Sequence, residues 1–118
     1  EKTKGMIDSN FLNKMKSSSY LINLSRGPII ENTNLILKSL ISNKLEGYAT
    51  DVWTEEPPLN DDELFNEWKI SKNNLKGRII VNPHTAYYSK EALYESRKKA
   101  CETCLDIISN KVINNRII

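Results

Sequence analysis

Four residues of this 118-residue sequence carry side chains that suit acid–base chemistry beside a bound anion. Arg26 supplies a guanidinium, Asp51 and Glu56 supply carboxylates, and His84 is the single histidine. An imidazole changes its charge near neutral pH and is the commonest general acid or base in enzymes. Each residue alone is weak evidence, because charged side chains next to turns are most often simply exposed to solvent.

Three short apolar segments have the length and composition of strands in a parallel sheet. They are residues 20–24, 48–53 and 78–82, each bounded by residues typical of turns. Helical patterns alternate with them over residues 9–16, 33–42, 61–68 and about 90–110, with expected N-caps at Asp8, Asn32 or Thr33, Asn60 and Ser89. Residues 111–118 are expected to be extended. This alternation predicts an α/β fold with helices covering a parallel sheet.

The expected sheet brings the candidate residues to one edge, because the carboxyl ends of parallel strands lie together and ligands bind there. Arg26 follows the first strand, Asp51 and then Glu56 follow the second, and His84 follows the third. An arginine, a carboxylate and a histidine on one rim form a set suited to catalysis. The alternative for Arg26 and Glu56 is a solvated turn or loop charge. His84 is more distinctive, because the proline before it fixes how the strand ends, and its alternative is a histidine on a surface loop.

Composition excludes several other classes of protein. The net charge is only +2, with 17 basic and 15 acidic residues, which argues against direct nucleic-acid binding. No apolar run is long enough to span a bilayer, so no membrane partner is expected. Cys101 and Cys104 are too few for a disulfide scaffold and, with one histidine, too few for a metal cage. Their position inside a long helix favours buried packing over redox chemistry.

Three ordered motifs resemble those of the D-isomer-specific 2-hydroxyacid dehydrogenase family. Residues 15–27, MKSSSYLINLSRG, resemble its M-K-x-G-A-x-L-I-N-x-x-R-G motif. Residues 45–57, LEGYATDVWTEEP, resemble G-x-x-x-D-V-x-x-x-E-P, and residues 80–89, IVNPHTAYYS, resemble the T-P-H-x-A/G block. The tyrosine–serine version of the last motif is similar to the branch that contains the C-terminal-binding-protein corepressors and related bacterial enzymes.

The resemblance implies an NAD(P)-dependent oxidoreductase that acts on a D-2-hydroxy acid or its 2-keto acid. Arg26 would bind the substrate carboxylate and carbonyl, for which a guanidinium fork is suited. Glu56 would pair with His84 and favour its charged form, and His84 would be the general acid/base. The resemblance further implies contacts to NAD, with NADP left open, from Leu24, Ser25, Arg26, Asp51, His84 and Ala86. Asp51 would contact the nicotinamide side.

The four glycines of the chain do not form the G-x-G-x-x-G turn that a dinucleotide site needs. We therefore expect residues 1–118 to form a single partial NAD-binding domain. It would be the C-terminal half of a Rossmann-like doubly wound sheet, without the glycine-rich half and the substrate domain. The isolated chain is expected to be inactive and to bind NAD weakly.

Two alternatives to the oxidoreductase remain open from the sequence. One is an NAD(H)-sensing, corepressor-like interaction module, and the other is an inactive fragment. For the full-length protein we expect a homodimer in the cytoplasm, or in the nucleus if it is corepressor-like. The expected small-molecule partner is a 2-hydroxy or 2-keto acid.

Overall fold

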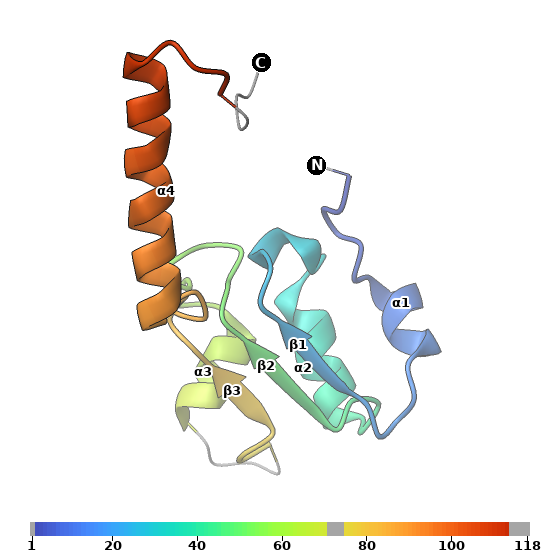
Figure 1. Ribbon diagram of the computed structural model, residues 1–118. Helices are drawn as coiled ribbons and strands as arrows, with labels where there is room; N and C mark the ends of the chain where they lie inside the picture. Colours follow the sequence, from blue (N-terminus) through green and yellow to red (C-terminus); the bar gives the residue numbers. More distant parts are fainter. Residues whose placement is uncertain (1, 71–74, 114–118) are drawn as a thin grey trace. The chain divides into compact units, whose positions relative to one another are not determined.

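The computed structural model describes residues 2–70 and 75–113, and the chain divides into two compact units, Glu1–Ala86 and Tyr87–Ile118. The first unit contains, in order, α1 (Ser9–Lys14), β1 (Tyr20–Asn23), the 3₁₀ helix η1 (Gly27–Ile29), α2 (Thr33–Ile41), β2 (Gly47–Thr50), α3 (Glu63–Ile70) and β3 (Ile79–Val81). The second unit contains α4 (Lys90–Ile108) (Figure 1). Apart from η1, this is the predicted order. The expected tail lies outside the described residues from position 114 onward.

The three strands form one parallel sheet in the order β1-β2-β3 (Figure 1). Tyr20 is in register with Gly47, and Tyr48 with Ile79. Sequential parallel strands joined through helices are the βαβ arrangement, which confirms the predicted α/β class. All three strands therefore end at the same edge of the sheet.

Side-chain caps begin the helices at three of the four predicted positions, Asp8, Asn32 and Ser89. The prediction of Asn60 as a cap is wrong: α3 begins later, and Asp62 Oδ1 accepts the Phe65 amide at 2.9 Å. Asp62 also accepts the Thr33 hydroxyl at 2.9 Å, so a tertiary contact helps to select it. The first and last helices each end two residues before their predicted ends, at Lys14 and Ile108.

One face of the sheet packs against α2 and α3. Tyr48 and Ile79 are buried on this face, and the packed cluster includes the fully buried residues Ile36, Leu40, Leu45 and Leu64. Burial raises the pKa of Tyr48 to about 12, so its phenol stays neutral in the core. This packing holds the three strands, and hence the loops at their carboxyl ends, in fixed positions.

The opposite face of the sheet is open within the described residues. Tyr20 and Ile22 of β1 and Ile80 of β3 are 67%, 62% and 61% exposed. The first strand was predicted to be buried. This is wrong for its alternate residues, Tyr20 and Ile22, whose side chains are exposed. Successive side chains of a strand point to opposite faces, and the described helices of the first unit cover only one of them.

The second unit has no buried residue in α4. The predicted burial of Cys101 and Cys104 is wrong, because both are exposed free thiols on this helix. Within the described ranges, no group of three or more His, Cys, Asp or Glu side chains could hold a metal ion. In the same ranges, no helix has both the length and the apolar character needed to cross a bilayer.

Candidate active site

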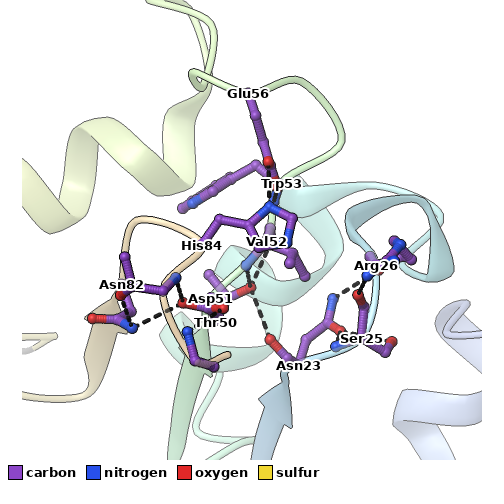
Figure 2. A network of polar contacts seen from close by, with 12 residues as sticks. Asn23, Ser25, Arg26, Thr50, Asp51, Val52, Trp53, Glu56, Asn82 and His84 are labelled. Carbon is purple, nitrogen blue, oxygen red and sulfur yellow. Dashed lines mark hydrogen bonds and ion pairs between the residues drawn. The ribbon is translucent and has the colours of Figure 1, made fainter. Parts of the chain in front are cut away.

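Glu56 and His84 meet at the carboxyl edge of the sheet, as the strand order predicts (Figure 2). Glu56 Oε2 lies 2.6 Å from His84 Nδ1, and the two side chains are 38% and 45% exposed. Glu56 Oε1 accepts the Trp53 amide at 3.0 Å, so both carboxylate oxygens are held. Because an ionised carboxylate only accepts hydrogen bonds, Nδ1 carries the proton. Nε2 is then the nitrogen that can exchange a proton with a ligand.

Hydrogen bonding keeps Glu56 ionised. The bond from His84 and then the bond from the Trp53 amide lower the pKa of Glu56 below its ordinary value, despite partial desolvation. The ionised Glu56 favours the tautomer of His84 that carries the proton on Nδ1. The Glu56–His84 pair therefore leaves Nε2 of His84 as the nitrogen that can contact a ligand.

The loop that carries His84 is wrapped around a buried carboxylate, Asp51, which is 2% exposed. Asp51 Oδ1 accepts the Thr85 amide at 2.8 Å and the Asn82 side-chain amide at 2.8 Å, and Oδ2 accepts the Ala86 amide at 2.9 Å. Burial raises the pKa of Asp51, but these three bonds outweigh it and hold the pKa below its ordinary value. Asp51 therefore anchors the loop as an ionised group.

His84 itself adopts a backbone conformation that non-glycine residues rarely use, with φ of 53°. This left-handed conformation costs about 1–2 kcal/mol for an L-residue. It persists only where the surroundings determine it, and the bonds to Asp51 on either side of His84 do so.

Arg26 lies on the neighbouring loop after β1, and among the described residues no hydrogen bond or ion pair joins it to Glu56 or His84 (Figure 2). Its Nη1 donates to the Ser25 carbonyl at 2.7 Å, and among the described residues it forms no ion pair. Asn23 shapes this turn by accepting from the Ser25 amide and donating to the Arg26 carbonyl, both at 3.1 Å. The guanidinium is thus positioned and its charge is available to an anion.

Gly27 brings the Arg26 loop into contact with the loop that leads to Glu56. A Cβ at Gly27 would lie 1.9 Å from the carbonyl carbon and 2.0 Å from the carbonyl oxygen of Trp53. Only glycine permits this approach. The same residue, Trp53, donates its amide to Glu56, so the two loops share one backbone segment.

An aromatic cluster packs beside the loop that carries Glu56. Trp53 packs edge-on against Phe65 at 5.4 Å between ring centroids, and Phe65 stacks on Trp68 at 5.5 Å. These rings, with Pro57 and Pro58, line a cavity of about 440 Å³ beside His84. Sequence reasoning missed this cluster, as it missed Asn23 and Asn82, although Asn23 and Asn82 lie inside motifs that it had singled out.

The lowered carboxyl pKa values predict the acid stability of the chain. Groups whose folded pKa is lowered stabilise the fold at neutral pH, and that contribution is lost as pH falls below the ordinary carboxyl pKa and through the lowered folded pKa. Asp51→Asn should lower the urea midpoint at pH 7 and make its fall between pH 5 and pH 2 shallower. The exposed Asp61→Asn is the matched control. A D51N midpoint that falls as steeply as that of the wild type would contradict the assignment.

Comparisons with known proteins identify a family and relatives that this chain is similar to. A family model described as "D-isomer specific 2-hydroxyacid dehydrogenase, NAD binding domain" matches residues 1–86. A D-lactate dehydrogenase of Lactobacillus delbrueckii subsp. bulgaricus is 31% identical over 110 residues, which cover 90% of this chain and 33% of that protein.

Solved structures show the same fold at low sequence identity. A D-lactate dehydrogenase with NAD⁺ from Lactobacillus jensenii matches 99% of this chain and 36% of its own, with a TM-score of 0.83 and 18% identity. A D-isomer specific 2-hydroxyacid dehydrogenase from Xanthobacter autotrophicus Py2, in complex with NADPH and MES, matches 99% and 43%, with a TM-score of 0.75 and 19% identity. These matches confirm the partial Rossmann-like fold. The chain spans about a third of the length of the curated relatives it matches.

Proposed function

The chain belongs to the family of D-isomer specific 2-hydroxyacid dehydrogenases, and from that premise we propose that the intact protein is an NAD(P)-dependent oxidoreductase. Its reaction interconverts a D-2-hydroxy acid and the corresponding 2-keto acid. The observation that carries the proposal is the Glu56–His84 pair at 2.6 Å, which leaves Nε2 available for proton exchange.

The proton step belongs to His84. In keto-acid reduction, the carbonyl oxygen gains negative charge and takes a proton from Nε2 of the imidazolium. Glu56 holds Nδ1 and stabilises the positive charge until the proton leaves. In the reverse direction, the neutral imidazole accepts the hydroxyl proton at the same nitrogen. Two fixed hydrogen bonds on Glu56 keep the ring oriented in both directions.

Substrate binding falls to Arg26. Its guanidinium can receive a carboxylate through two parallel N–H···O bonds, and it has no competing carboxylate among the described residues. A positive charge here also stabilises the oxygen that becomes negative during reduction. A small anionic 2-keto acid is therefore the substrate class that we propose.

The residues present suit the nicotinamide end of NAD(P), which would supply the hydride when bound. The three bonds to Asp51 leave one acceptor position on Oδ2, which suits an amide donor. Leu24 is 62% exposed, and it lies with Ser25 along a cavity of about 470 Å³ at the end of β1. We propose that the cradle for the cofactor phosphates lies outside these 118 residues, because no G-x-G-x-x-G occurs within them.

The experiment that tests the proposed function is reduction of 2-keto acids by the intact protein, followed by loss of NADH or NADPH absorbance. Pyruvate and keto acids with larger side chains would be compared. We expect turnover with at least one of them. Tight NADH binding without turnover of any keto acid would argue against the proposal.

Arg26→Lys should impair both KM and kcat for the 2-keto acid. Lysine keeps the charge but loses the bidentate fork, so kcat/KM should fall about 10- to 100-fold, the value of one charged hydrogen bond. Lys38→Arg, a charge-conserving change on α2, is the control. Steady-state kinetics measure both constants. An R26K variant with wild-type kcat/KM would remove Arg26 from the substrate site.

The oligomeric state, the cellular location and the branch of the family stay predictions. We propose a homodimer for the full-length protein and a cytoplasmic location. Membership of the corepressor branch is supported only by residues 87–89. The dehydrogenase names of the relatives favour the oxidoreductase over the corepressor-like module.

A further inference from the structure

We propose that Asn82 is a positioning residue for His84, a role that rests on the proposed function. The Asn82 side-chain nitrogen donates to Asp51 Oδ1 at 2.8 Å and to Thr85 Oγ1 at 2.9 Å (Figure 2). One side-chain amide, at the start of the His84 loop, thus links to Thr85 on the far side of His84 and to the buried Asp51 carboxylate.

The chemistry of this link requires an amide. Asn82 uses both protons of its NH₂ group, one toward a carboxylate and one toward a hydroxyl. An aspartate of the same shape has no proton to donate when ionised, and a threonine has one. The backbone of Asn82 is held as well, because its amide donates to the Thr50 carbonyl at 2.9 Å. Asn82 is therefore a fixed point from which the loop departs.

The link matters because His84 stands in the left-handed region two residues later, with φ of 53°. Without Asn82, Asp51 Oδ1 keeps only the Thr85 amide, and the Thr85 hydroxyl loses its donor. The loop can then relax toward ordinary backbone angles. Such a movement would withdraw Nδ1 from Glu56 Oε2 and turn Nε2 away from its working position.

The single histidine allows a direct test in the 118-residue chain. Imidazole ¹H–¹⁵N spectra report one side chain, and the hydrogen-bonded Hδ1 proton of His84 should give a protected downfield signal. Asn82→Asp keeps the shape and removes both donors, so this signal should be lost. Thr85→Val, an isosteric change at an exposed residue, removes one acceptor and should weaken the signal without threatening the fold.

Kinetics of the intact protein supply the second reading. We expect Asn82→Asp to lower kcat about 10- to 100-fold, which is the scale for misplacing a catalytic group by about 1 Å, with little change in the KM for NADH. Asn66→Leu is the control, since it removes another side-chain amide bond, to the Asn60 carbonyl on an exposed loop.

The readings separate this proposal from the proposed function. Loss of the Hδ1 signal in an intact protein that reduces no keto acid would reject the function and keep the structural link. An unchanged Hδ1 signal in both Asn82→Asp and Thr85→Val would overturn the positioning role. So would an Asn82→Asp enzyme with wild-type kcat.

Discussion

Replacing His84 with glutamine is expected to lower kcat of keto-acid reduction by the intact protein about 10²- to 10⁴-fold, the usual contribution of general acid–base catalysis. Glutamine can accept and donate hydrogen bonds near Glu56, but it cannot deliver a proton from a cationic nitrogen. The loss should fall mainly on kcat, because Arg26 and the other expected cofactor contacts, at Leu24, Ser25, Asp51 and Ala86, are left in place.

Steady-state kinetics at neutral pH, with NADH binding measured separately, would check this expectation. Glu55→Gln is the control variant, because Glu55 is an exposed acid directly before Glu56. Glu56→Gln should behave as a weaker version of the histidine change, since the imidazole stays but its orienting charge is lost. Unchanged turnover in His84→Gln would eliminate the proposed proton step.

Replacing Gly27 with alanine is expected to destabilise the chain by about 3 kcal/mol or more, the upper range for forcing atoms into a packed site. The new methyl group would lie 1.9 Å from the Trp53 carbonyl carbon, and backbone atoms cannot move aside as a flexible side chain can. Relief of this clash requires the two loops to separate. That separation would also change the position of Arg26 relative to Glu56.

Urea unfolding of the 118-residue chain measures this effect, and Gly77→Ala provides the contrast. Gly77 has a φ of +78°, and no atom of the described residues lies within 4 Å of an added Cβ, so only backbone strain of about 1 kcal/mol is expected there. Similar midpoints for the two variants would show that the contact between the loops is not tight in solution.

Local signals in the sequence were sufficient for most of the fold. Asp8, Asn32 and Ser89 cap helices as predicted, because capping depends on residues within one turn. The cap at Asp62 was missed because its choice involves Thr33, 29 residues away. The exposed face of β1 was missed because strand composition does not tell which face a helix will cover.

The site was predictable to the extent that it follows from strand order. The carboxyl ends of parallel strands share an edge, so strand order alone predicts that Glu56 and His84 lie close together. The roles of Asn82 and Gly27 depend on distances between loops, which no spacing in the sequence encodes. The contact of Asp51 with the cofactor stays a prediction, and the sequence did not indicate that three of its acceptor positions hold the His84 loop.

Gly27 and Trp53 also restrict how the rim of the sheet can move. Trp53 meets Gly27 through its carbonyl and Glu56 through its amide, so a displacement of either loop is transmitted through a single peptide segment. Any movement of this rim would therefore carry the Arg26 loop and the Glu56 loop together, because both are tied to Trp53. The relative position of the Arg26 guanidinium and the Glu56–His84 pair would then be preserved whenever the rim moves.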